Sequence, residues 1–262
     1  MGSLKDLAIN MVFWAYNATA RSLPKSAKLA RDPFVALNDY FDACWVLSIQ
    51  RNQERHPSIR EHLKGLNFEF FWGVDGRALK RNDPRYDLSR AINLYRRDVH
   101  VNELACTMSH LVIFQTILEK GLNRVLVLED DAILIRKHSP WVSCCLESLP
   151  ADWELFYLGY RDGELRGFAR EAQEIFGRRR DDTEVVSRSV GKGIRTAAFH
   201  DFTHGYAVTQ TGARKLLENA YPVYHTADGW LEENIRARKL KAYISIPKLF
   251  AQRADLISSL HS

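Results

Sequence analysis

Residues 124–135 read RVLVLEDDAILI, and this stretch decides the fold of the chain. An apolar run of this kind is typical of a strand that is buried on both faces of a parallel sheet. It ends in three adjacent carboxylates, Glu129, Asp130 and Asp131. Like charges side by side resist burial unless water or a cation compensates them. The acids therefore either begin a helix, whose first turn they would stabilise, or form a metal clamp at the strand end.

Strand-like and helix-like segments alternate on both sides of this stretch. Residues 43–49, 67–76 and 153–160 have the apolar, β-rich composition of strands. Apolar residues at helical spacing predict a long helix over 102–122, ended by Gly121. This β-α-β order predicts an α/β domain with a mostly parallel, Rossmann-like sheet flanked by helices. Residues 161–203 show no clear element, which indicates a functional loop or local disorder.

Composition limits the class of protein. The chain has 262 residues, 46% of them hydrophobic, which fits one large domain with at most a short appendage. A net charge of +5 is too small to select a partner, and without interleaved aromatic and basic residues we expect no nucleic acid. The four cysteines have no regular spacing, so neither a disulfide scaffold nor a structural zinc site is expected. We expect a reducing, cytoplasmic compartment.

The N-terminal segment needs a separate interpretation. We predict a helical segment over 1–40 and the main domain over 41–262. Apolar residues recur at helical spacing from Leu4 to Ala15, and basic residues follow as far as Arg31. The run is too short to span a bilayer, and no basic region precedes it as in a secretory signal. Residues 4–31 therefore form either a helix packed on the domain or an interfacial helix that makes peripheral contact with the inner face of a membrane.

Several segments together resemble glycosyltransferase family 25. The most specific is ELACTMSHLVIFQTILEKGLNRVLVLEDDAIL at 103–134, a helix with an A-C-x-x-S-H pattern leading into L-E-D-D. CWVLSIQRNQER at 44–55, FFWGVDGRAL at 70–79 and THGYAVTQTGARKLL at 203–217 follow the family order. The resemblance covers roughly residues 42–259. It implies a GT-A type fold, a UDP-sugar donor, usually UDP-galactose, and inverting transfer to a hydroxyl.

The resemblance also implies roles for individual residues. The E-D-D run stands where other GT-A enzymes carry D-x-D. Glu129 and Asp131 would then hold Mn²⁺ (or Mg²⁺) against the donor diphosphate, and Asp130 would lie near the ribose or the metal. Further residues are expected to bind the donor: Ser48, Arg51, Arg55, Asp75, Ser109, His110 and His204.

Each of these residues also has a structural interpretation. The two arginines could be surface residues at a helix start, and Asp75 could make a turn within GVDG. His110 could be a hydrogen-bonded core histidine, and His204 could cap its strand.

Inverting transfer needs a carboxylate that deprotonates the attacking hydroxyl. Asp228 in YHTADGWLEE is our candidate base, with Glu232 and Glu233 as rivals. The family segment usually reads P-V-D, so Thr226 and Ala227 before the acid depart from the pattern. His225 is either a metal ligand or a surface residue.

Two functions follow from the sequence. The first is a metal-dependent hexosyltransferase, in particular a galactosyltransferase, acting on a glycan or glycolipid such as a lipooligosaccharide or surface polysaccharide. The second is a weakly active or inactive family member that binds a nucleotide or a partner. Phosphoryl transfer is disfavoured because the chain has no G-x-x-x-x-G-K-[ST] motif.

Overall fold

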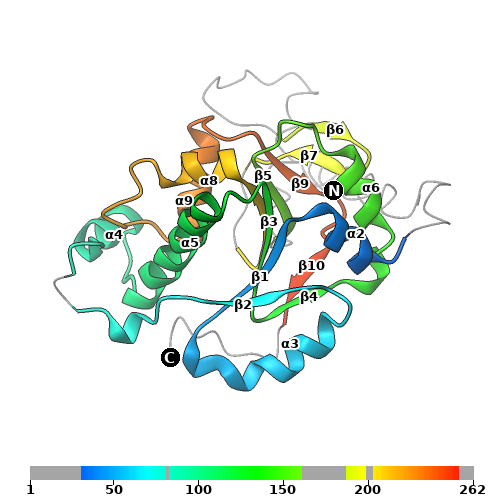
Figure 1. The fold of residues 1–262 in the computed structure, drawn as a ribbon. Helices are drawn as coiled ribbons and strands as arrows, with labels where there is room; N and C mark the ends of the chain where they lie inside the picture. The colour runs from blue at the N-terminus through cyan, green and yellow to red at the C-terminus, as the bar shows by residue number, and fades with distance from the viewer. Residues whose placement is uncertain (1–30, 81–82, 161–186, 199–202, 254–262) are drawn as a thin grey trace, which may run out of the picture.

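The computed structural model describes residues 31–80, 83–160, 187–198 and 203–253. Figure 1 shows a central sheet with helices on both sides, so the α/β class is confirmed. The helices and 3₁₀ turns (η) are α2 (Pro33–Tyr40), η2 (Gln50–Arg55), α3 (His56–His62), η3 (Gly76–Ala78), α4 (Leu88–Tyr95), α5 (Val101–Lys120), η4 (Arg136–His138), α6 (Trp141–Ser148), α8 (Gln210–Leu217) and α9 (Ala227–Arg236). The strands are β1 (Ala43–Ser48), β2 (Glu69–Trp72), β3 (Arg124–Glu129), β4 (Ala132–Leu134), β5 (Leu155–Gly159), β6 (Ser189–Gly191), β7 (Ile194–Thr196), β8 (Gly205–Thr209), β9 (Ala242–Ser245) and β10 (Phe250–Gln252).

The sheet has the order β2-β1-β3-β8-β5-β9-β7-β6, and β10 joins it by pairing with both β5 and β4. Strand β1 is parallel to β2 and to β3, and β5 is parallel to β9. Strand β8 lies antiparallel between β3 and β5, so β3 and β5 point the same way. The main strands therefore share one direction, and their carboxyl ends meet at one edge of the sheet.

Two apolar cores cover the two faces of the sheet. Alternate residues of a strand point to opposite faces, so Val127 joins the core under α5, α8 and α9, while Leu126 joins the core under α2, α3 and α6. Both residues have no exposed surface. Helix α2 belongs to this second core through Phe34 and Leu37, although it precedes the predicted boundary at residue 40. The predicted strand buried on both faces is thus confirmed for β3.

Helix α5 is the long helix that the periodicity predicts. It begins with a capping box, in which the Glu103 carboxylate accepts from the backbone N–H of His100. It ends at Gly121, whose positive φ of 65° suits glycine. Among the described residues it alone is long and apolar enough to cross a membrane, but 67% of its most apolar window is buried inside the fold. Its apolar character therefore reflects packing against the sheet, α8 and α9.

The segment 161–203 contains more structure than its pattern indicates. Strands β6 and β7 form an antiparallel pair that extends the sheet beyond β9. Each has three residues, too few for alternation to be recognised, and Gly193 between them has a φ of 72°. The rest of the predicted loop, 161–186 and 199–202, and residues 4–30 of the predicted membrane-contacting helix lie outside the described residues.

Candidate functional site

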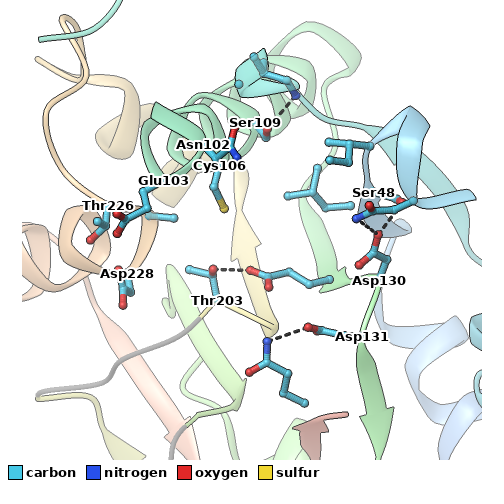
Figure 2. A pocket seen from close by; sticks show the side chains of 18 of the residues that line it. Ser48, Asn102, Glu103, Cys106, Ser109, Asp130, Asp131, Thr203, Thr226 and Asp228 are labelled. Atoms are coloured by element: carbon cyan, nitrogen blue, oxygen red, sulfur yellow. Dashed lines mark hydrogen bonds between the residues drawn. The ribbon is translucent and has the colours of Figure 1, made fainter. Parts of the chain in front are cut away.

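The carboxyl ends of β1 and β3 form one side of a cavity of about 490 Å³ (Figure 2). Leu47 of β1 pairs in parallel with Glu129 of β3, so the residues that follow each strand lie next to each other. Residues of η2, α5 and the first turn of α9 complete the lining. Ligands of open α/β sheets bind beyond the carboxyl ends of the strands, and the cavity occupies that position.

Asp130 serves as an anchor for the loop after β1. Its Oδ2 accepts hydrogen bonds from the Ser48 hydroxyl at 2.7 Å and from Asn52 Nδ2 at 3.2 Å. Its Oδ1 pairs with Arg55 Nη1 at 3.0 Å. Both oxygens are engaged, and the residue is only 7% exposed. A carboxylate with these three partners is compensated inside the protein and has little need of a further cation.

Asp131 is the least compensated acid of the run. Its Oδ2 accepts from Gln252 Nε2 at 2.7 Å, but its buried Oδ1 has no hydrogen-bond partner among the described residues. Burial, followed by repulsion from Glu129, raises the pKa of Asp131 from 3.8 to about 7. A buried carboxylate with one unsatisfied oxygen requires either a proton or a cation.

Glu129 is half-buried and has more partners than Asp131. Its Oε1 accepts a hydrogen bond from the Thr203 hydroxyl, and His110 Nε2 lies 3.7 Å away. Burial alone would raise the pKa of Glu129, but His110 and Thr203 outweigh it and hold the pKa below its usual value. Glu129 is therefore a carboxylate whose charged form is favoured before any metal binds.

The donor set of the acid run suits a hard divalent cation. Glu129 and Asp131 both line the cavity and offer carboxylate oxygens, the ligands that Mg²⁺ and Mn²⁺ prefer. The unpartnered Asp131 Oδ1 is an observation in this structure that such a cation would explain. Glu129 and Asp131 therefore fit the predicted Mn²⁺ or Mg²⁺. Asp130 is excluded from this pair because Ser48, Asn52 and Arg55 already engage both of its oxygens.

Two arginines line the same side of the cavity. Arg51 Nη1 lies 3.1 Å from Asp75 Oδ1, and Arg55 pairs with Asp130. Asp75 also accepts from the backbone N–H of Arg77 at 3.0 Å, so it makes the predicted turn as well as the ion pair. The arginines are held in place by carboxylates while they border the cavity, which is the setting in which guanidinium groups bind phosphate.

Asp228 lies on the opposite wall, in the first turn of α9, and Figure 2 shows it and Thr226 across the cavity from the acid run. Its Oδ1 accepts from the backbone N–H of Gly229 at 2.9 Å. The Thr226 side chain caps the helix. The rivals Glu232 and Glu233 lie further along α9 and are not among the residues that line the cavity. The structure thus brings one of the three candidate bases to the site.

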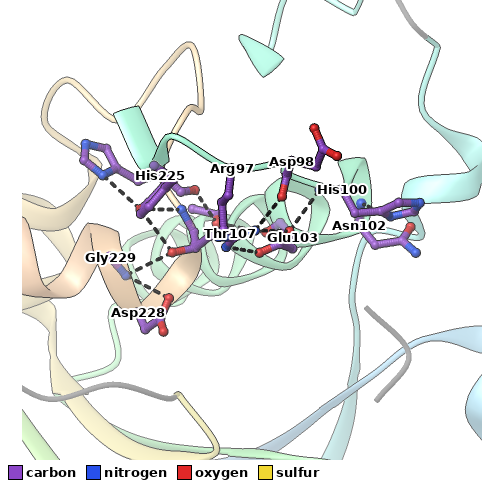
Figure 3. A network of polar contacts seen from close by, with 11 residues as sticks. Arg97, Asp98, His100, Asn102, Glu103, Thr107, His225, Asp228 and Gly229 are labelled. Atoms are coloured by element: carbon purple, nitrogen blue, oxygen red, sulfur yellow. Dashed lines mark hydrogen bonds and ion pairs between the residues drawn. The ribbon is translucent and has the colours of Figure 1, made fainter. Parts of the chain in front are cut away.

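A polar network supports the wall around Asp228 (Figure 3). Arg97 makes a two-point contact with Glu103, with Nη1–Oε1 and Nη2–Oε2 distances of 3.0 and 2.6 Å. Tyr95 Oη accepts from the backbone N–H of Thr226 at 3.1 Å. All four residues line the cavity. Tyr95 holds the start of α9 against α4, and the Thr107 hydroxyl of α5 donates to the His225 carbonyl just before α9.

Eight of the eleven predicted site residues line the cavity: Ser48, Arg51, Arg55, Ser109, Glu129, Asp130, Asp131 and Asp228. Asp75 lies behind Arg51. His110 is a buried core histidine bonded to Tyr206 Oη at 2.8 Å, and His204 is also buried. Ser109 Oγ accepts from the Val74 N–H and donates to the Ala105 carbonyl, both at 2.8 Å, so its hydroxyl serves the fold.

His225 fits neither of its predicted roles. It is only 9% exposed, and its ring packs at a tilt against the rings of Tyr224 and Trp230. Its carbonyl accepts from the Thr107 hydroxyl at 2.8 Å. We had expected a metal ligand or a surface residue. Its aromatic neighbours instead bury it against α5, which a short-range sequence pattern does not reveal.

Several residues that complete the site do not stand out in the sequence: Asn52, Cys106, Thr203 and Gln252, together with Arg97 and Glu103. Thr203 and Gln252 contact acids that are 74 and 121 positions away in the sequence. The only available signal was their place within segments that resemble the family, next to His204 and in the closing strand.

Comparisons with known proteins identify the family of the chain. The family model "Glycosyltransferase family 25 (LPS biosynthesis protein)" matches residues 41–231. Procollagen galactosyltransferase 1-B of Xenopus laevis is 26% identical over 70% of this chain and 29% of its own length. Probable inactive glycosyltransferase 25 family member 3 of Rattus norvegicus is 25% identical over 73% of this chain and 32% of its own length.

A solved glycosyltransferase that glycosylates the major capsid of PBCV-1 superposes with a TM-score of 0.42 at 9% identity, over 82% of this chain and 94% of that one. The chain spans about a third of the length of the curated relatives. The family model, in contrast, covers most of this chain, including the acid run, both arginines and Asp228. The chain belongs to glycosyltransferase family 25.

Proposed function

We propose that this chain transfers a hexose, specifically galactose, from a UDP-sugar to a hydroxyl of a glycan acceptor. The reaction inverts the anomeric centre and depends on Mn²⁺ or Mg²⁺. The observation that carries the proposal is the arrangement of acids about one cavity. Glu129, Asp131 and Asp228 all line the cavity, and Figure 2 shows Asp131 and Asp228 on opposite sides of it. A volume of about 490 Å³ lies within the range of small-molecule sites.

The donor's position follows from charge. Arg51 and Arg55 border the cavity beside the acid run, so a diphosphate placed there meets guanidinium donors on one side. A divalent cation held by Glu129 and Asp131 would neutralise charge on the leaving diphosphate as a Lewis acid. The sugar then points toward α9, where Asp228 begins the opposite wall.

Asp228 is suited to act as the base. In the proposed reaction the acceptor hydroxyl attacks the anomeric carbon, the bond from that carbon to the UDP oxygen breaks, and the hydroxyl proton passes to an Asp228 oxygen. Attack from the face opposite the leaving group inverts the anomeric centre, which requires the base and the diphosphate on opposite sides of the sugar. The positions of Asp131 and Asp228 on opposite sides of the cavity support this proposal.

The relatives and the fold support the finer parts of the proposal. Galactose is favoured because relatives are named procollagen galactosyltransferases. A lipooligosaccharide or surface polysaccharide is favoured as acceptor because the family model is described as an LPS biosynthesis protein. All four cysteines are free thiols, which supports a reducing location on the cytoplasmic side of a membrane. Residues 4–31 would provide the peripheral contact.

The first experiment measures hydrolysis and transfer of UDP-galactose, UDP-glucose and UDP-N-acetylglucosamine by the full chain, with EDTA and with added Mn²⁺. We expect Mn²⁺-dependent turnover of UDP-galactose in the wild-type protein and little in the Asp131→Asn variant. The Asp152→Asn variant, altered in an exposed acid that pairs with Lys241, is the matched control. Turnover that is equal with EDTA, or intact in Asp131→Asn, would refute the metal-dependent mechanism.

The second candidate function is nucleotide binding without transfer. One relative is named a probable inactive family member, and the residues before Asp228 depart from P-V-D. This function predicts Mn²⁺-dependent UDP binding with neither transfer nor hydrolysis of any donor. Measuring UDP binding by calorimetry on the same samples separates the two functions.

A further inference from the structure

Three chemically different ligands meet beneath the cavity. Cys106 and His110 are four residues apart on α5, so they lie on the same face of the helix. Glu129 ends the neighbouring strand β3. The Cys106 sulfur, a His110 ring nitrogen and a Glu129 oxygen all lie within 4.8 Å of one another. Figure 2 shows the Cys106 side chain directed from α5 into the cavity.

His110 is oriented as a metal-binding histidine would be. Its Nδ1 lies 2.8 Å from Tyr206 Oη, and the side chain is 3% exposed. Its Nε2 has no hydrogen-bond partner among the described residues and lies 3.7 Å from Glu129 Oε1. That separation is too long for a hydrogen bond. A histidine whose one nitrogen is fixed by a neighbour, with the other facing a carboxylate, is the arrangement that places a cation between them.

The chemistry of the three donors selects the metal. A thiolate sulfur, an imidazole nitrogen and a carboxylate oxygen form a mixed set that suits Zn²⁺, whereas the oxygen pair of Glu129 and Asp131 suits Mn²⁺ or Mg²⁺. Three protein ligands also leave one position of a tetrahedral zinc site for water. We propose that Cys106, His110 and Glu129 form a zinc-binding site in the floor of the cavity. Binding releases the thiol proton of Cys106 to solvent as the sulfur–zinc bond forms.

The two sites share one ligand. Glu129 belongs to the proposed zinc site and to the Glu129–Asp131 pair, so Zn²⁺ and Mn²⁺ compete for it. Inhibition of transfer by Zn²⁺, relieved by excess Mn²⁺, follows from this competition and rests on the proposed function. The zinc site itself does not depend on that function, because its binding is measured directly.

The test uses Co²⁺ as a spectroscopic substitute for Zn²⁺ on the metal-free full chain. We expect a thiolate-to-cobalt charge-transfer band at one Co²⁺ per chain, which Zn²⁺ abolishes by displacement. Cys106→Ser should lose the band. The control Cys144→Ser should keep it, because Cys144 lies on α6 outside the cavity, with its sulfur 3.8 Å from the Lys192 carbonyl. Asp131→Asn should also keep it, even if that variant has lost Mn²⁺-dependent turnover.

A second variant examines His110 without removing a ligand. Tyr206→Phe deletes the hydroxyl that fixes the ring and should weaken Zn²⁺ binding by about tenfold or more, with the cobalt band retained. Two results would overturn the zinc site. One is a thiolate-to-cobalt band that persists in Cys106→Ser, and the other is a wild-type protein that binds Co²⁺ without this band. Unchanged Zn²⁺ affinity in Tyr206→Phe would refute the role of Tyr206 in fixing the ring, and unchanged Zn²⁺ affinity in His110→Ala would overturn the site.

Discussion

Replacing Asp131 by asparagine should stabilise the metal-free protein while it removes metal-dependent activity. Asp131 is 8% exposed, and one of its oxygens has no partner among the described residues. Asparagine has the same shape and retains an oxygen that can accept from Gln252. The variant therefore removes the buried charge and leaves the packing of the site intact.

The expected gain follows from the pKa of Asp131, which is about 7 in the folded protein against an ordinary 3.8. This difference sets a ceiling of about 4 kcal/mol on the cost of ionising the residue in the fold. Part of that cost is repulsion shared with Glu129, which either acid can relieve by taking up a proton. We therefore expect Asp131→Asn to raise the free energy of unfolding by about 2 kcal/mol at pH values above 7.

The gain in the free energy of unfolding from Asp131→Asn should depend on pH in a defined direction. Because the folded pKa is raised, the native state holds a proton that the unfolded state has released between about pH 4 and about pH 7. The wild-type protein thus loses stability as the pH rises through that window, and the variant does not. The difference should be largest near pH 8 and small near pH 4.

Urea unfolding in EDTA at several pH values measures this difference, with Asp152→Asn as the control. Asp152 is exposed and its partner Lys241 lowers its pKa, so its replacement should give no gain. Added Mn²⁺ should stabilise the wild-type protein by mass action and have little effect on Asp131→Asn. A variant no more stable than wild type at pH 8, or a gain that does not shrink on acidification, would refute the reasoning.

Three further predictions concern the rest of the site. Asp228→Asn should lower the transfer rate by about a hundredfold or more, with little change in KM for the donor. The control Glu233→Gln, which changes an exposed residue, should retain wild-type kinetics. Equal losses in both variants would refute the choice of Asp228 as the base. Gly229→Ala should lower the free energy of unfolding in urea by about 1–3 kcal/mol, because the added Cβ would lie 2.1 Å from Tyr95 Oη. Adding Tyr95→Phe to this variant should recover part of the loss. Thr203→Val should raise the pKa of Glu129, because it removes a hydrogen bond that lowers this pKa. The Mn²⁺ concentration for half-maximal turnover should therefore rise most at low pH. An equal rise at all pH values would contradict this cause.

The sequence allowed the position of the site to be predicted, because that position depends on local patterns. The β-α-β order indicated a mostly parallel sheet, and ligands of such sheets bind beyond the carboxyl ends of the strands. The acids were expected at such an end, and the structure places Arg55, which follows β1, beside them because β1 and β3 are parallel neighbours. The helix 102–122 was predicted from its periodicity and from Gly121, and the structure confirms it as α5 within one residue at its start.

The division of roles among the acids could not be predicted, because it depends on long-range contacts. Asp130 and Asp131 are adjacent in the sequence, but one faces Ser48 and Asn52 and the other faces Gln252. No spacing rule indicates which of two neighbouring carboxylates finds a cationic partner inside the protein. His110 illustrates the same limit, since only the position of Tyr206 on β8 decides that its Nδ1 is occupied.

Two of the three adjacent carboxylates are compensated inside the protein by different groups, and the third is not. Arg55, Ser48 and Asn52 neutralise or solvate Asp130. Thr203 and His110 favour the charged form of Glu129. Asp131 has only Gln252 as a side-chain hydrogen-bond donor among the described residues, and its pKa of about 7 reflects this deficit. A structural acid would be expected to find its partners within the fold, as Asp130 does. Strand β4 follows the acids, so they do not begin a helix. The deficit at Asp131, on the wall of a cavity, is the property that the proposed metal site would explain, and the stability of Asp131→Asn measures that deficit directly.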